Sequence, residues 1–125
     1  MRSWLRETIL PTILETVRNK IVEVNKTYYN KTTSSTLIQA DTIWIPSVRE
    51  IFGETTYEDS GVDYTTVFKN GASRIKKYNN TVKEYWLRSA YNSNNTRFQY
   101  GGTFGGTLNG SANRVNGVCI AFCTN

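Results

Sequence analysis

The two cysteines are the side chains of this chain best suited to redox or copper chemistry, and they lie four positions apart, at Cys119 and Cys123. On an extended strand, residues four apart share a face but are separated by about 13 Å. A disulfide requires Cα atoms within about 7 Å. We therefore expect two unpaired thiols that act as small buried hydrophobic side chains, unless the strand ends before Cys123.

The chain contains no histidine, which excludes Ser-His-Asp and Cys-His catalysis and any metal site with a histidine ligand. The acidic cluster of Glu54, Glu58, Asp59 and Asp63 is interpreted as a solvated loop. Residues 91–125 carry no carboxylate, so a Ca²⁺ site would find no acidic oxygen donors there. We expect no catalytic residue, no metal ion and no cofactor.

Residues 91–116 combine aromatic, amide, arginine and glycine residues in a pattern typical of a binding surface. Tyrosine supplies rigid contact area, asparagine and serine supply adaptable hydrogen bonds, and glycine lets loops fold back. The alternative is that asparagine and glycine simply fill turns, although turns alone do not require Arg97, Gln99, Tyr100 and Phe104. The candidate ligand-binding residues are Tyr91, Asn92, Asn94, Asn95, Arg97, Gln99, Tyr100, Thr103, Phe104, Asn109, Ser111, Asn113, Arg114 and Asn116. Changing Tyr100 and Arg97 to alanine is expected to abolish ligand capture with little effect on the melting temperature.

The length of 125 residues corresponds to one domain, which we expect to span residues 1–125. The net charge of +5 arises from basic residues scattered among acids, which argues against a nucleic-acid partner. Membrane insertion is not expected, because no apolar run approaches the roughly 20 residues of a spanning helix. The first residues also lack a signal-peptide hydrophobic region.

Two helices are predicted at the start of the chain. Ser3 can cap a helix over about residues 3–9, and Pro11 can open a second helix that runs to about Lys20. Residues 21–29 are rich in β-branched and aromatic side chains and are predicted to be extended, followed by a polar loop over 30–36.

A strand is predicted over residues 42–45, and the Ser47-x-x-Glu50 spacing predicts a capping box for a short helix that ends at Gly53. A short helix around 64–69 would end at Asn70-Gly71. Further strands are predicted at 85–89, 97–100 and 117–122, joined by glycine-containing loops or hairpin turns. Helices first and strands last indicate an α+β domain.

Three parts of this pattern together resemble a known family. They are the Ser3-Trp4-Leu5-Arg6 helix, the Asp41-Thr42-Ile43-Trp44-Ile45-Pro46-Ser47 segment, and the pair Tyr85-Trp86-Leu87-Arg88-Ser89 and Gly117-Val118-Cys119-Ile120-Ala121-Phe122. The order is similar to that of a domain of unassigned function in Firmicutes surface proteins and phage proteins, a branch of the C-type lectin fold. Formylglycine-generating enzymes and the variable proteins of diversity-generating retroelements share that fold. Two departures are Cys119-Ile120 in place of Arg-Pro and the absence of the N-terminal strand that normally pairs with the closing strand.

The resemblance implies two N-terminal helices packed on a small, mostly antiparallel, twisted sheet with long C-terminal loops. The resemblance also places the diversified segment of the retroelement proteins at residues 91–116. Independently of it, side chains of consecutive strand residues point to alternate faces, so Trp86 is expected to pack in the core and Arg88 to donate to loop carbonyls. Trp44 is likewise expected in the core. The missing strand would come from a longer parent protein or from a neighbouring protomer.

The function that this resemblance implies is non-catalytic, Ca²⁺-independent recognition of a protein or glycan ligand. The domain would belong to a larger assembly on a phage virion or bacterial cell surface, and a homo-oligomer is compatible with that role. The first alternative is a structural module that caps a surface or tail fibre. The second is a residual enzyme of the formylglycine-generating type.

Overall fold

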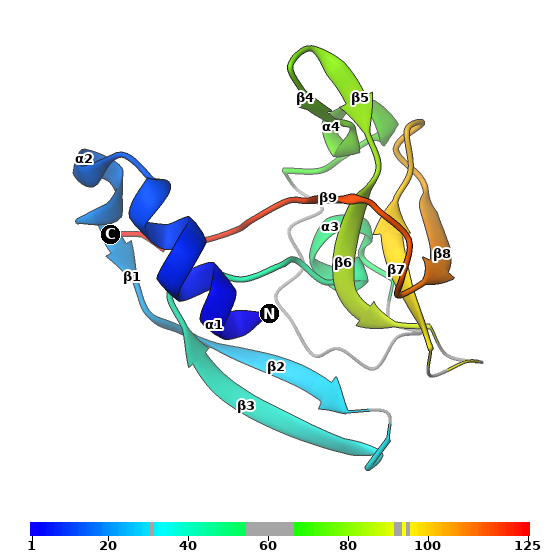
Figure 1. The fold of residues 1–125 in the computed structure, drawn as a ribbon, viewed down its shortest axis with the longest axis horizontal. Helices are drawn as coiled ribbons and strands as arrows, with labels where there is room; N and C mark the ends of the chain where they lie inside the picture. The colour runs from blue at the N-terminus through cyan, green and yellow to red at the C-terminus, as the bar shows by residue number, and fades with distance from the viewer. Residues whose placement is uncertain (31, 55–66, 92–93, 95) are drawn as a thin grey trace.

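A computed structural model describes residues 1–30, 32–54, 67–91, 94 and 96–125 of the chain. Short helices and mostly antiparallel strands alternate in it, which confirms the α+β class (Figure 1). The elements are α1 (Arg2–Trp4), η1 (Leu5–Ile9), η2 (Leu10–Thr12), α2 (Glu15–Arg18), β1 (Ile21–Val22), β2 (Val24–Asn30), β3 (Ser35–Asp41), α3 (Val48–Phe52), α4 (Gly71–Arg74), β4 (Lys76–Tyr78), β5 (Thr81–Lys83), β6 (Tyr85–Ala90), β7 (Arg97–Gly101), β8 (Thr107–Ser111), β9 (Gly117–Val118) and β10 (Cys123–Thr124).

The largest sheet has the strand order β8-β7-β6-β9, in which only β9 runs parallel to its neighbour. The β2–β3 and β4–β5 hairpins form two further sheets, and β1 pairs with β10 in the last. Figure 1 shows both hairpins projecting from the body of the domain, on opposite sides. The closing segment, residues 115–125, crosses the middle of the molecule between them and ends beside the N-terminal helices.

The helical stretch at the N-terminus is continuous from Arg2 to Thr12, so Pro11 lies in its last turn and does not open the second helix. That expectation was wrong because the backbone of Ile13 is extended, which separates Pro11 from α2. Leu5 is buried in a cluster with Ile43 and Ile45. The stretch therefore packs on the segment before α3, and this contact fixes its position.

Residues 30–36 contain a shorter loop than predicted, because β3 already begins at Ser35. The seven residues of β3 pair in continuous register with β2, from Asn30 opposite Ser35 to Val24 opposite Asp41. The strand β3 was not predicted from the sequence: its apolar residues Leu37 and Ile38 are adjacent and both exposed, so it lacks the alternation of a half-buried strand. At the other end of the hairpin, the Arg2 guanidinium donates to the buried carboxylate of Asp41, with Nη2 at 2.6 Å from Oδ1.

Residues 43–45 of the strand predicted over 42–45 are buried, but the segment forms an isolated β-bridge, between Trp44 and Ala121, and no longer strand pairing among the described residues. The capping box that follows is confirmed: the Ser47 hydroxyl accepts from the Glu50 N–H and the Glu50 carboxylate accepts from the Ser47 N–H. Gly53 ends α3 in the left-handed region, at φ 72°, as predicted.

Asn70 begins a helix, whereas the sequence predicted that Asn70-Gly71 ends one. Its side chain accepts from the Ser73 N–H at 3.0 Å and caps α4. The same asparagine can serve a turn or a cap, and the N–H groups that follow it decide which. Of the helix predicted around 64–69, residues 64–66 lie outside the described residues.

The core lies between α3 and β6, where Val48 and Ile51 pack against Tyr85 and Leu87. Because side chains alternate along β6, Trp86 is half-buried on the opposite face and not in the core as expected. Trp44 is buried as expected. The closing strand predicted over 117–122 is interrupted: it comprises β9 and the bridge at Ala121. Directly after it, β10 pairs with β1 of the same chain.

A buried group of charges joins three elements of this core. Glu50 of α3 lies between Lys26 of β2 and Arg88 of β6, and all three side chains are at least nine-tenths buried. Arg88 Nη1 also donates to the carbonyl of Ile45 at 3.0 Å, which confirms its expected bond to a loop carbonyl. Burial alone would raise the pKa of Glu50, but the two cations and their hydrogen bonds hold it below its ordinary value.

Candidate functional site

The candidate residues from 91 to 116 occupy three different parts of the structure. Tyr91 and Asn94 belong to the turn between β6 and β7, and Asn92 and Asn95 lie outside the described residues. The β7–β8 hairpin and its turn carry Arg97, Gln99, Tyr100, Thr103, Phe104, Asn109 and Ser111. The loop that leads from β8 to β9 carries Asn113, Arg114 and Asn116.

Gln99 and Tyr100 are not available on the surface, contrary to the expectation. Gln99 is 2% exposed and Tyr100 is 4% exposed, and their strand β7 is an inner strand of the sheet, between β6 and β8. The Tyr100 ring meets Trp86 edge to face at a centroid distance of 5.7 Å. The Arg114 guanidinium lies 4.8 Å from the Tyr100 centroid. Tyr100 is therefore a packing residue of the sheet.

Several polar candidates are engaged with the protein's own backbone and side chains. The Asn94 side chain accepts from the Thr96 N–H at 2.8 Å, which is the turn-forming role left open for asparagine. Arg97 Nη2 donates to the Asn109 carbonyl at 3.3 Å. Arg114 forms an ion pair with Glu84. These contacts order the loops that border the sheet.

Most exposed candidates lie near the two ends of β8, while exposed Asn94 lies in the β6–β7 turn. Phe104 is 93% exposed at the tip of the β7–β8 hairpin. At the other end of β8, its last residue Ser111 is exposed, as are Asn113 and Arg114 after it. Val115, which was not among the candidates, is 96% exposed next to Arg114. Phe104 and these polar residues are therefore the predicted residues that the structure leaves exposed, and Val115 adds an apolar side chain beside them.

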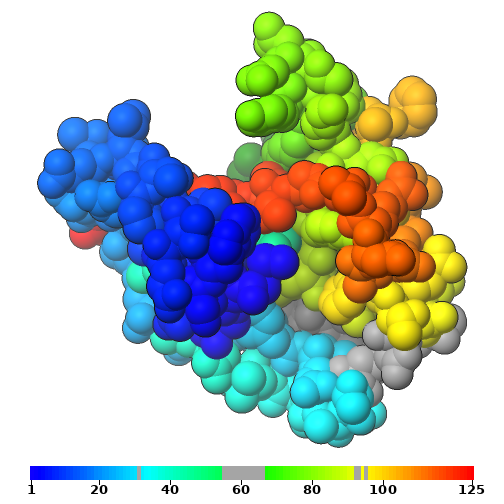
Figure 2. Space-filling model, in the orientation of Figure 1, coloured from blue at the N-terminus to red at the C-terminus, as the bar shows by residue number. Residues whose placement is uncertain are grey.

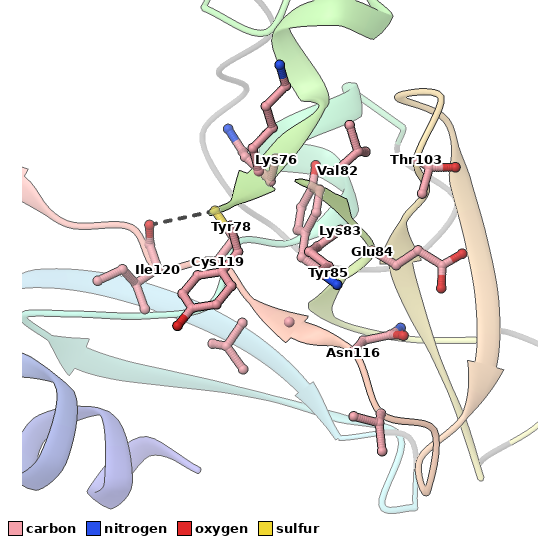
Figure 3. Close-up of a pocket in the computed structure, with 14 residues that line it drawn as sticks. Lys76, Tyr78, Val82, Lys83, Glu84, Tyr85, Thr103, Asn116, Cys119 and Ile120 are labelled. Carbon is pink, nitrogen blue, oxygen red and sulfur yellow. Dashed lines mark hydrogen bonds between the residues drawn. The ribbon is translucent and has the colours of Figure 1, made fainter. Parts of the chain in front are cut away.

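A cleft of about 830 Å³ lies between the β4–β5 hairpin and the closing segment, and we call it the lysine cleft. Figure 2 shows the hairpin standing over the closing segment, with a notch between it and the N-terminal helices. The cleft brings two candidates, Thr103 and Asn116, together with residues that sequence analysis missed. It is lined by Lys76, Lys77, Tyr78, Val82, Lys83, Glu84, Tyr85, Thr103 and residues 115–120 (Figure 3).

The three lysines of the cleft come from one hairpin. Asn79 and Asn80 both have positive φ, at 48° and 60°, and form the tight turn that brings Lys76 opposite Lys83. An Asn-Asn pair between short β-forming runs is a hairpin signal, and it could have located this element in the sequence. Like charges placed directly opposite each other on paired strands repel.

No carboxylate among the described residues forms an ion pair with these lysines. Glu84 is the acid of the cleft, and Arg114 pairs with it. Lys76 Nζ lies 4.6 Å from the Phe68 ring centroid, while Lys77 and Lys83 are exposed. Among the described residues, which do not include Glu58, Asp59 and Asp63, no acid neutralises these lysines. Val82, Val118 and Ile120 give the cleft apolar walls.

The titratable groups on the floor of the cleft are kept in their neutral forms. Burial raises the pKa of the Cys119 thiol, and the charge of Lys76 offsets this in part. Burial also raises the pKa of Tyr85 to about 12, with a further contribution from Cys119, while its hydroxyl donates to the Arg74 carbonyl at 2.8 Å. Cys119 and Cys123 are both free and half-buried, which is less burial than expected.

The arrangement is suited to binding an anion and an apolar group together. A neutral, half-buried thiol is a poor nucleophile. In the described part of the chain, no group of three or more Cys, Asp or Glu side chains is placed to hold a metal ion, and no helix is long and apolar enough to cross a membrane.

A smaller hollow of about 390 Å³ lies between the N-terminal helices and the face of the main sheet. Leu5, Trp86 and Phe98 give it apolar walls, and Arg2 and Arg88 lie at its border. The free donors of Arg88, Nε and Nη2, are covered by protein, so this hollow presents a mainly apolar surface.

Comparison with known proteins gives one family match. A family described as "Domain of unknown function (DUF6273)" matches residues 1–124. Neither the curated proteins nor the solved structures gave a match.

Proposed function

The chain belongs to the DUF6273 family, and we propose that it is a non-catalytic recognition domain that binds an anionic protein or glycan ligand without Ca²⁺. The ligand contacts the lysine cleft and the exposed loops on either side of it. The observation that carries the proposal is the cleft itself, which three lysines line together with the apolar side chains of Val82, Val118 and Ile120. No acid among the described residues pairs with these lysines.

The expected binding loops and the cleft form one continuous surface in this proposal. Thr103 and Asn116 belong to both. Exposed Phe104 directly follows Thr103 in the chain, and exposed Val115 directly precedes Asn116. Aromatic and apolar side chains provide contact area, while the lysines select for charge and speed association. Gln99 and Tyr100 support the loops from inside.

We place the domain in a larger assembly on a phage virion or bacterial cell surface, as a variant of the C-type lectin fold. This placement is supported by the resemblance of the Trp86-Leu87-Arg88-Ser89 strand and the closing segment to the domain of Firmicutes surface proteins and phage proteins. An experimental structure of a longer member of the family tests the fold. A reverse transcriptase gene next to a near-copy of the segment encoding residues 91–116 tests retroelement diversification.

Ligand capture by immobilised protein tests the binding proposal. Arrays of acidic and neutral glycans and of bacterial surface proteins are probed with the wild type, with the double variant Lys77→Glu/Lys83→Glu and with Lys20→Glu. All three lysines are exposed, so the charge changes leave the fold intact. Capture is expected to fall about tenfold or more in the double variant, to stay unchanged in Lys20→Glu and to be insensitive to a Ca²⁺ chelator. Equal capture by the double variant contradicts the proposal.

One observation favours the alternative of an assembly module. The β2–β3 hairpin projects from the domain (Figure 1), and its residues Leu37 and Ile38 are 53% and 65% exposed. An apolar edge strand of this kind is a surface for contact with another subunit. If assembly is the function, the protein forms an oligomer in light scattering that Leu37→Glu/Ile38→Glu dissociates, and the ligand arrays give no capture.

A further inference from the structure

We infer that the lysine cleft receives an extended acidic segment of a partner protein, which adds as a strand along the free edge of the closing segment. The inference rests on the proposed function and specifies the class of ligand. It follows from which backbone groups of the closing segment are already bonded.

Among the described residues, the backbone bonds that tie the closing segment to the rest of the protein lie on one of its edges. Gly117 N–H donates to the Glu84 carbonyl at 2.9 Å, Ala121 N–H to the Trp44 carbonyl at 2.8 Å, and Asn125 N–H to the Lys20 carbonyl at 3.1 Å. Successive residues of an extended chain direct their backbone groups to opposite edges. Residues 117, 121 and 125 are an even number of positions apart, so they share one edge.

The backbone N–H and C=O groups of the residues in between, namely Val118, Ile120 and Phe122, point to the other edge. In the part of the chain that the structure describes, β9 is the last strand of its sheet and β10 has only β1 as a neighbour. The contact from Cys119 Sγ to the Ile120 carbonyl is long, at 4.0 Å, and leaves that acceptor open. From residue 117 to 122 this edge is about 20 Å long, the length of an ordinary strand.

The free edge borders the lysine cleft, because residues 115–120 line it. A strand added to an edge lies about 4.8 Å away, which places it between the closing segment and the β4–β5 hairpin. Backbone hydrogen bonds supply affinity in such additions, and pockets for alternate side chains supply specificity. Figure 3 shows Cys119 and Ile120 of the closing segment on the side of the cleft across from Lys76.

Charge complementarity defines the side chains of the added segment. Lys76, Lys77 and Lys83 line the wall opposite the edge, without an acidic partner among the described residues. Glutamate or aspartate at alternate positions of the partner would neutralise them and remove the repulsion between Lys76 and Lys83. The other alternate positions would pack β-branched side chains on Val118 and Ile120.

A synthetic peptide of alternating glutamate and valine tests the inference. Titration with this peptide is expected to slow amide hydrogen exchange at Val118, Ile120 and Phe122, while the bonded amides of Gly117 and Ala121 change little. The same peptide with N-methyl groups at alternate residues cannot pair through its backbone and is expected to bind at least tenfold more weakly. Equal binding of the methylated peptide, or unchanged exchange at the three amides, overturns the inference.

Two pairs of variants separate the backbone from the side chains. Val118→Pro removes the edge N–H and is expected to weaken peptide binding, whereas Val118→Ala keeps that N–H and retains most of it. Lys77→Glu/Lys83→Glu is expected to abolish binding, and Lys20→Glu to leave it unchanged. Equal peptide binding by Val118→Pro and Val118→Ala contradicts strand addition.

An oligogalacturonate titration distinguishes failure of this inference from failure of the proposed function. If this acidic glycan binds in a lysine-dependent way and the acidic peptide does not, strand addition is overturned and recognition at the cleft stands. If the wild type and Lys77→Glu/Lys83→Glu bind the peptide, the glycan and the array ligands equally, the proposed function is overturned as well.

Discussion

Arg88 of β6 and Glu50 of α3 form a buried ion pair, which joins the strand at the centre of the domain to the helix that covers it. Lys26 forms a second ion pair with Glu50, and its Nζ lies 2.5 Å from the other carboxylate oxygen. The same carboxylate completes the capping box with Ser47. One side chain therefore organises β2, α3 and β6 together.

Glu50→Gln is expected to destabilise the protein by about 3–5 kcal/mol. Glutamine preserves the size of the side chain and an acceptor for Ser47, but it leaves two buried cations without a counter-charge. Urea unfolding followed by circular dichroism measures the change. Glu23→Gln, at an exposed position, is the control and should shift the unfolding free energy by less than about 0.5 kcal/mol. A change in Glu50→Gln as small as in the control would contradict the structural role.

The stability of the wild type is expected to fall in acid because of the same residue. The pKa of Glu50 is lower in the folded protein than its ordinary value of 4.5. Its contribution is therefore fully present above about pH 4.5 and is lost as the pH falls through the folded pKa. Unfolding free energies measured between pH 6 and pH 3 should converge for the wild type and Glu50→Gln. Parallel curves across this range would show that Glu50 is not charged in the folded state.

Tyr100→Ala is expected to destabilise the domain by about 3–5 kcal/mol, because it removes a buried ring between Trp86 and Arg114. The sequence alone predicted little change in melting temperature for a variant at this position. Phe104→Ala is the matched aromatic control: its ring is 93% exposed, so the melting temperature should hardly move. Scanning calorimetry of the two variants decides between a packing role and a surface role for Tyr100.

Gly105→Ala is expected to destabilise the β7–β8 hairpin by at least about 1–2 kcal/mol. Gly105 has φ 77°, and a Cβ there would lie 2.1 Å from the Gly71 carbonyl oxygen. The neighbouring Gly106 provides the control, since a Cβ at that position meets nothing within 4 Å. Thermal unfolding should separate Gly105→Ala from Gly106→Ala. Similar stabilities for both would mean that the hairpin does not pack against the start of α4.

Predictions from the sequence succeeded where the physical cause is local. The Ser47–Glu50 capping box and Gly53 act within one turn of helix, and their spacing was sufficient to place α3. The strand that contains Trp86 and Arg88 was also found, because its aromatic and β-forming residues favour extended backbone. Local signals failed at Pro11 and Asn70, where one residue type can either begin or end a helix.

Burial separated the predicted binding residues into two groups. The types and spacing of residues 91–116 indicated aromatic and amide contacts, but position in the sheet decided that Tyr100 packs inside while Phe104 is exposed. The strand order that places β7 between β6 and β8 depends on pairing between distant segments. No pattern within residues 91–116 contains that information.

The sequence by itself determined the α+β class, the capped helix, the exclusion of histidine chemistry and the lack of acids after residue 90. Only the tertiary structure decided that Lys76 and Lys83 face a closing segment more than thirty residues further along the chain. The physical reason is the separation along the sequence of the residues that interact. Caps and turns are governed by hydrogen bonds between residues a few positions apart, whereas the cleft exists because the packing of the core brings two distant backbone segments side by side.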